Sequence, residues 1–116
     1  MSEQTSPANV LVLVRDLMFV SKITATARAA GIELTLLRNP DQLQSQPANR
    51  LIVDLALPGA IPAARRWRDA TGRPVTAFVA HTDTAAITEA RAAGLDRVLT
   101  RGRFTEDLPQ LLAEEI

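Results

Sequence analysis

Asp54 is the residue whose type and position best suit a chemical role. It ends the run Leu51-Ile52-Val53-Asp54, in which three consecutive aliphatic residues predict a strand buried on both faces of a parallel sheet. Ligand and reaction sites in open α/β sheets lie outside the carboxyl ends of the strands, so a carboxylate here is well placed to bind or react. The alternative is an aspartate that only caps the strand end or shapes the loop before Pro58.

The amino-acid composition excludes several other kinds of functional site and partner. The 116 residues include no cysteine and one histidine, His81, which excludes disulfides and thiolate catalysis and disfavours a histidine metal site. Thirteen basic residues balance thirteen acidic ones, so the net charge gives no argument for a nucleic-acid or membrane partner. No run approaches the roughly 18 apolar residues of a membrane span, and the N-terminus lacks the apolar core of a signal peptide. We therefore expect a soluble, cytoplasmic domain.

Five strands and five helices are expected to alternate along the chain and to position Asp54. The expected strands are Val10–Val14, Ile32–Leu37, Arg50–Asp54, Val75–Ala80 and Asp96–Thr100. The expected helices are Leu17–Ala30, a short helix from Pro40, Pro62–Ala70, Ala85–Ala93, and a last helix that Thr105 caps after a loop at residues 101–104. Residues 1–8 are expected to form a flexible tail and residues 9–116 a single domain. Short connections favour right-handed crossovers, which predicts an α/β three-layer, flavodoxin-like sandwich; its five-stranded parallel sheet usually has the order 2-1-3-4-5.

Three segments carry a resemblance to a known family. They are Val-Arg-Asp at 14–16, Val-Asp-Leu-Ala-Leu-Pro at 53–58 and Ala-Gly-Leu-Asp-Arg-Val-Leu at 93–99. The chain resembles the receiver (CheY-like) domain of bacterial two-component response regulators from Val10 to Leu112. The resemblance implies a stand-alone signalling domain that is not an enzyme, in which a histidine kinase phosphorylates Asp54 while Asp16 and Asp54 hold Mg²⁺. It also implies a protein partner, either a histidine kinase or an output protein, and it allows a homodimer.

Three positions depart from the family pattern around Asp54. Arg15 stands where the family has an acidic residue, Val79 where it has a threonine or serine, and Arg101 where it has a lysine. Arg101 is either a substitute for that lysine or a solvated surface residue. The other expected neighbours of the pocket are Ala80, His81 and Thr82. Thr82 would supply the missing hydroxyl if the alignment slips by a few residues.

Arg15 leads to the first functional hypothesis. A guanidinium in the pocket would pair with Asp54 or Asp16, lower the pKa of that carboxyl and compete with Mg²⁺. The chain would then be a degenerate pseudo-receiver that needs no cofactor and acts through protein contacts. If Arg15 turns to solvent, weak Mg²⁺ binding remains and Asp54 is a working phosphoacceptor. A small-ligand role on a flavodoxin-like fold is the third alternative, and the absence of glycine from the turn after the first strand disfavours it.

Charged residues around the last strand and helix form the expected partner surface. They are Arg91, Arg97, Arg103, Glu106 and Asp107. Receivers commonly dimerise or dock partners on this face, and the mixed charges suit a specific polar interface. The alternative is an ordinary solvated surface.

Trp67 is the remaining candidate for partner binding. It lies in a basic cluster of Arg65, Arg66, Arg68 and Arg73. An exposed tryptophan there could anchor a protein partner or stack on a nucleic-acid base. The alternative is a solvated helix face with Trp67 half-buried against it, and the neutral net charge favours this alternative over nucleic acid.

Overall fold

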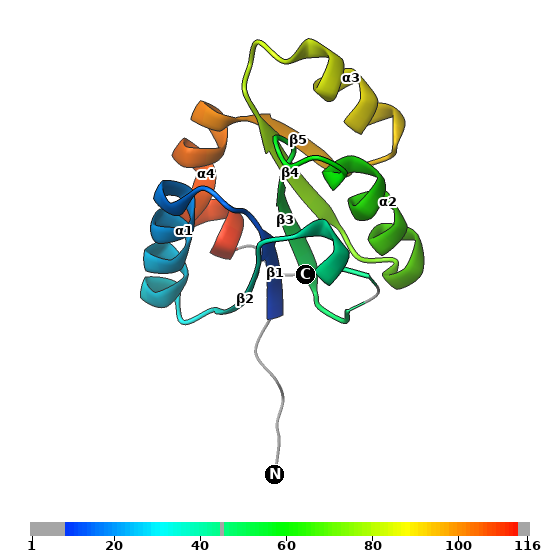
Figure 1. The fold of residues 1–116 in the computed structure, drawn as a ribbon. Coiled ribbons are helices and arrows are strands. Elements are labelled where there is room, and N and C mark those ends of the chain that lie inside the picture. The colour runs from blue at the N-terminus through cyan, green and yellow to red at the C-terminus, as the bar shows by residue number, and fades with distance from the viewer. Residues whose placement is uncertain (1–8, 45, 114–116) are drawn as a thin grey trace.

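The computed structural model describes residues 9–44 and 46–113, which form five parallel strands, four helices and one 3-10 turn (Figure 1). The strands are β1 (Asn9–Leu13), β2 (Glu33–Leu37), β3 (Arg50–Asp54), β4 (Val75–Val79) and β5 (Arg97–Thr100). The helices are α1 (Leu17–Ala30), α2 (Ala60–Thr71), α3 (Thr84–Ala92) and α4 (Arg101–Ala113), and the 3-10 turn is η1 (Pro40–Gln42). The strand order is β2-β1-β3-β4-β5, which confirms the predicted order. The tail predicted at residues 1–8 lies outside the described residues.

The sheet is the middle of three layers. Helices α1 and α4 cover one face, and η1, α2 and α3 cover the other (Figure 1). Successive side chains of β3 point to opposite faces, so Leu51 and Val53 join the core under α2 while Ile52 joins the core under α1 and α4. Strand β3 is therefore buried on both sides at the centre of the sheet, and it delivers Asp54 to the middle of the carboxyl edge. None of the helices in the described residues is long and apolar enough to cross a bilayer.

The prediction of five helices is wrong, because the described residues form four. Between β2 and β3 the chain forms only the single turn η1, although Asn39 caps it and Pro40 opens it as expected. Prolines 40 and 47 bracket this segment, and the backbone preceding a proline disfavours the α conformation. Gln44 also has a φ of 38°, in the left-handed region, so a helix cannot continue through it.

The last helix begins earlier than predicted. We expected a loop at residues 101–104 with Thr105 as the cap, but α4 begins at Arg101 directly after β5. Thr100 performs the capping role, because its Oγ1 accepts a hydrogen bond from the backbone N–H of Arg103 at 3.2 Å. The direct strand-to-helix transition fixes Arg101 at the carboxyl edge of the sheet. Helix α2 likewise begins at Ala60, two residues before the predicted Pro62.

Arg50 is a buried charge at the amino edge of the sheet. It is the first residue of β3, is only 6% exposed, and donates hydrogen bonds to the carbonyl oxygens of Leu111 and, at 2.8 Å, Leu112. The last turn of a helix leaves its carbonyls without intrahelical donors, and the helix dipole favours a cation there. Arg50 therefore fastens the C-terminal end of α4 to the start of β3.

Candidate functional site

Asp54 lies at the end of the central strand and is almost fully enclosed. The residue is 3% exposed, and its Oδ1 accepts a hydrogen bond from the backbone N–H of Ala56 at 2.9 Å. Its Oδ2 lies 3.8 Å from Nη2 of Arg101. Burial raises the pKa of the Asp54 carboxyl above its ordinary value, while the Ala56 hydrogen bond and the Arg101 charge oppose that rise. The negative charge of Asp16 adds to the increase in the pKa of Asp54.

Arg101 supplies the cation that faces Asp54. It is the first residue of α4, its side chain is 40% exposed, and its Cζ lies 5.3 Å from the ring centroid of Phe19. A guanidinium over an aromatic face is held by the ring quadrupole as well as by a carboxylate. The Arg101 Nε is buried and has no hydrogen-bond partner among the described residues. Arg101 therefore contacts the carboxylate of Asp54.

Three phenylalanines form an aromatic cluster, and Arg101 lies over the ring of one of them, Phe19. The ring centroids of Phe19 and Phe78 are 4.8 Å apart, and those of Phe78 and Phe104 are 4.3 Å apart in a stacked arrangement. Phe19 comes from α1, Phe78 from β4 and Phe104 from α4, so the cluster joins the elements that surround the site. The predicted neighbours of the pocket did not include Phe19, which contacts Arg101. The scarcity of aromatics, 3% of the chain, was the available signal.

The predicted pairing of Arg15 with Asp54 or Asp16 is wrong. The Arg15 side chain is exposed, and its Nε and Nη2 donate hydrogen bonds to the carbonyl oxygen of Arg38 at 3.2 and 3.1 Å. Strand β2 pairs with β1, so the backbone that follows β2 offers an acceptor beside the end of β1. Asp54 already faces Arg101, and Arg15 turns outward as the alternative interpretation expected.

Asp16 is occupied as the N-cap of α1. Its Oδ1 accepts hydrogen bonds from the backbone N–H groups of Met18 at 2.8 Å and Phe19 at 3.4 Å. Within residues 9–44 and 46–113 there is no group of three or more histidine, aspartate or glutamate side chains placed to hold a metal ion. One Asp54 oxygen accepts a backbone hydrogen bond and the other faces Arg101, whose positive charge opposes a divalent ion at this carboxylate.

The other predicted pocket neighbours take no part in polar contacts with Asp54. Val79 is buried at the end of β4 and has no hydroxyl, and Ala80, His81 and Thr82 are exposed in the turn before α3. No hydrogen bond in the described part of the chain joins His81 or Thr82 to Asp54. Asp83 ends this turn by capping α3, because its Oδ1 accepts a hydrogen bond from the backbone N–H of Ala86 at 3.1 Å.

The arginines and Glu106 of the expected partner surface are exposed, whereas Trp67, the separate candidate for partner binding, is buried. Arg91, Arg97, Arg103 and Glu106 are all exposed, and Nη1 of Arg103 lies 3.7 Å from Oε1 of Glu106. Trp67 is 0% exposed, and its Nε1 donates a hydrogen bond to the carbonyl oxygen of Gln46 at 2.7 Å. The suggestion that Trp67 anchors a partner is therefore wrong, because the inward face of α2 carries it into the core.

Comparison with solved structures places this arrangement in a known fold. The BeF3-activated receiver domain of DrrB, a response regulator of Thermotoga maritima, superposes with a TM-score of 0.77 and 13% identity over 92% of this chain and 95% of that one. The fold is that of a response-regulator receiver domain. The CheY-like receiver domain of Methanospirillum hungatei gives a TM-score of 0.75 at 13% identity, covering 92% of this chain and 94% of its own. The receiver domain of Francisella response regulator 1452 gives 0.74 at 19% identity, covering 90% and 93%.

The relation to receiver domains is one of structure. No protein-family model matches the chain, and no curated protein matches it in sequence. At identities of 13% to 19% the similarity establishes the receiver fold and does not assign an activity to Asp54.

The raised pKa of Asp54 gives the first testable prediction, that Asp54→Asn stabilises the domain at neutral pH. A folded-state pKa above the unfolded value imposes no penalty below the unfolded pKa, and the penalty develops as pH rises through the folded pKa. The asparagine Oδ1 can still accept the Ala56 hydrogen bond, and the partly exposed Arg101 remains solvated. We expect the melting temperature at pH 7 to rise by about 2 to 6 °C, and the difference from wild type to shrink as pH falls toward 4.

Thermal unfolding of both proteins from pH 4 to 8 measures this effect. Asp96, whose pKa is lowered chiefly by its hydrogen bond with Arg68, contributes equally to both proteins and cancels in the difference. Asp69→Asn, at a side chain that is 68% exposed on α2, is the control and should show no such gain. A lower melting temperature for Asp54→Asn at pH 7 would show that the Arg101 contact outweighs the cost of burial.

Proposed function

We propose that this chain is a receiver-like signalling domain of the degenerate, pseudo-receiver kind, which acts in the bacterial cytoplasm through contacts with other proteins. The observation that carries the proposal is the contact between Asp54 and Arg101, 3.8 Å apart at a carboxylate that is 3% exposed. In this proposal a side chain of the domain itself provides the positive charge that a bound cation provides in the family.

The chemistry of phosphoryl transfer supports this interpretation. Transfer to a carboxylate depends on cations that neutralise the incoming oxygens and on open access to the acceptor. Asp54 lacks open access because it is 3% exposed, and the cation beside it is the guanidinium of Arg101, which belongs to the domain itself. The stacking of Arg101 on Phe19 holds that guanidinium in place from the other side.

The exposed charges of α3, β5 and α4 are the proposed contact surface. Arg91 and Arg97 are exposed, while Arg103 lies within 4.0 Å of both Glu106 and Asp107. Charges of both signs on one face favour a partner with a complementary pattern and disfavour a uniformly charged one. The partner in this proposal is a signalling protein, either a histidine kinase, an output protein or a second copy of the chain.

A metal titration of Arg101→Met tests the proposal. We expect wild type to show no saturable amide NMR shift at Ala56 with Mg²⁺, because the guanidinium repels the ion. Removing a unit charge a few ångström from the ion should strengthen Mg²⁺ binding by at least about fivefold, so Arg101→Met should show a saturable shift. Arg103→Met removes the same charge two residues along α4, on the exposed surface, and should behave as wild type.

A working phosphoacceptor is the second candidate, and one observation favours it. Arg15 points away toward the Arg38 carbonyl, so the side chain that was expected to block the site leaves Asp16 and Asp54 uncovered by a second guanidinium. If wild type binds Mg²⁺, then beryllofluoride, and shifts the amides of β4 and β5, Asp54 is a phosphorylation site and the pseudo-receiver proposal fails.

A further inference from the structure

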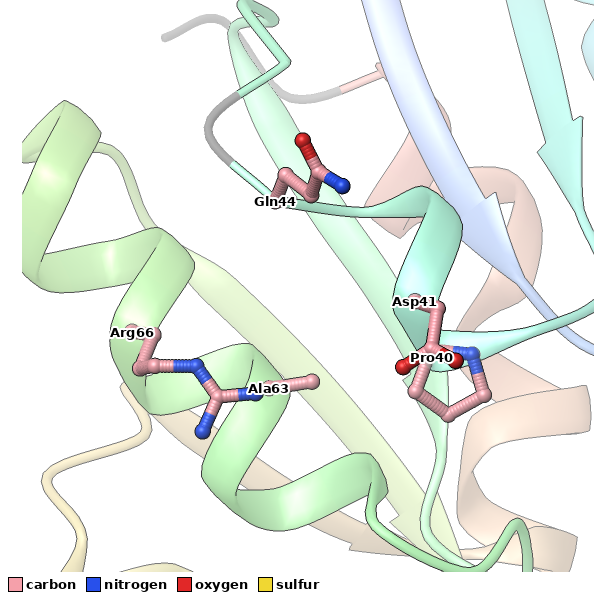
Figure 2. Close-up of a pocket in the computed structure, with 5 residues that line it drawn as sticks. All are labelled: Pro40, Asp41, Gln44, Ala63 and Arg66. Atoms are coloured by element: carbon pink, nitrogen blue, oxygen red, sulfur yellow. The ribbon is translucent and has the colours of Figure 1, made fainter.

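A small polar cavity lies between η1 and α2, on the opposite side of the sheet from α1 and α4. It measures about 190 Å³ and is lined by Pro40, Asp41, Gln44, Ala63 and Arg66 (Figure 2). The cavity lies where the predicted helix between β2 and β3 is replaced by the single turn η1. Figure 2 shows Asp41 on the η1 wall and Arg66 on the facing α2 wall.

Arg66 differs from the other arginines of its cluster. Arg65 pairs with Asp69 at 3.9 Å, Arg68 pairs with Asp96 at 2.8 Å, and Arg73 donates a hydrogen bond to the carbonyl oxygen of Asn49 at 3.0 Å. Arg66 has no hydrogen-bond or ion-pair partner within residues 9–44 and 46–113. Its guanidinium is therefore the member of the cluster that remains available to an external anion.

Asp41 provides the opposite charge on the facing wall. Its backbone N–H is held by Oδ1 of Asn39 at 3.0 Å, which fixes the residue in η1, while its carboxylate has no donor within the described residues. Asp41 and Arg66 line the same cavity without forming an ion pair. Gln44 adds an amide at the rim and holds a strained positive φ of 38°, and such strain is often found at binding sites.

We propose that this cavity binds a small zwitterion of the amino-acid type, with its carboxylate on Arg66 and its ammonium on Asp41. The planar guanidinium matches a carboxylate with two parallel hydrogen bonds, and a carboxylate accepts from an ammonium. Asp41 repels a ligand that carries only negative charge, and Arg66 repels one that carries only positive charge. The volume of about 190 Å³ suits a small molecule. This site is separate from Asp54 and does not depend on the function proposed above.

Amide NMR titration of the wild-type chain with glycine, β-alanine and γ-aminobutyrate tests the proposal. These three zwitterions differ in the separation of their charges, and one should fit the spacing of Arg66 and Asp41 best. We expect saturable shifts at Asp41, Gln44, Ala63 and Arg66, with dissociation constants of about 30 mM or weaker, because exposed ion pairs contribute little free energy. Sodium acetate with methylammonium chloride at the same concentration should give no saturable shift there.

Matched variants identify the contacts. Arg66→Gln and Asp41→Asn should each weaken binding of the preferred zwitterion about tenfold, while Arg65→Gln, on the same exposed part of α2, should leave it unchanged. Spectra of the free variants, with dispersed amide signals as in wild type, show that the fold is intact. The proposal is overturned if none of the three zwitterions gives saturable shifts in wild type, or if Arg66→Gln binds as tightly as wild type.

Discussion

Trp67→Ala is expected to lower the free energy of unfolding by about 4 kcal/mol, within the range for truncating a large buried aromatic. Trp67 is fully buried in the core under α2 and donates a 2.7 Å hydrogen bond to the carbonyl oxygen of Gln46. The substitution leaves a cavity in the core, and it also removes the hydrogen-bond donor to the carbonyl oxygen of Gln46. Urea unfolding followed by far-UV circular dichroism measures the change, since the variant lacks the only tryptophan of the chain.

Two further proteins separate the contributions to this loss. Trp67→Phe keeps a large ring and removes the N–H donor, so it should cost about 1 to 2 kcal/mol. Leu17→Ala removes a large apolar side chain that is 71% exposed and should change stability by less than about 0.5 kcal/mol. A loss below about 1 kcal/mol for Trp67→Ala, or fluorescence of wild type typical of a hydrated indole, would contradict the buried position.

Arg50→Met is expected to destabilise the domain by about 3 kcal/mol. The methionine fills much of the same volume but cannot donate hydrogen bonds to the carbonyl oxygens of Leu111 and Leu112. Removing one partner of a buried charged interaction leaves the other without compensation, which costs about 3 to 5 kcal/mol when both are charged and less for carbonyls. Chemical unfolding gives the total loss, and hydrogen exchange should show the last turn of α4 opening first.

Arg65→Met is the matched control for Arg50→Met. Arg65 also carries a guanidinium, but it is exposed and its 3.9 Å pair with Asp69 lies one turn away on the same helix. Exposed pairs of this kind contribute about 0.3 to 0.5 kcal/mol. Similar losses for the two variants would mean that burial of Arg50 does not strengthen its contact with α4.

The sequence predicted the layers of the fold because the signals for them are local. Runs such as Leu51 to Val53 identify strands buried on both faces, and Gly31 takes the left-handed conformation that ends α1. The helix expected after Pro40 did not form, since proline suits the first turn of a 3-10 and of an α-helix equally well. What distinguishes them is the left-handed backbone at Gln44, which composition does not reveal.

Only part of the candidate site could be predicted, and the physical reason differs from the one that limited the prediction of the fold. Asp54 was found because its position follows from where a strand ends, whereas Arg101 was named because it stands where the resembled family has a lysine. The direction of a long side chain does not follow from that, and Arg15 has its acceptor on Arg38, 23 positions away in the chain. Which guanidinium faces Asp54 therefore depends on tertiary contacts, including the stacking of Arg101 on Phe19.

Strand β3 and helix α4 form a pair of matched length that is attached at both ends. Five strand residues span about 17 Å and thirteen helical residues about 20 Å, so Arg50 meets the end of the helix while Asp54 meets its start. The hydrogen bonds of Arg50 are to backbone carbonyls and do not depend on the charge of Asp54. The contact between Asp54 and Arg101 does depend on that charge. A change in the charge of Asp54 would therefore move the N-terminal end of α4, near Arg101, more than its C-terminal end, which Arg50 holds in place.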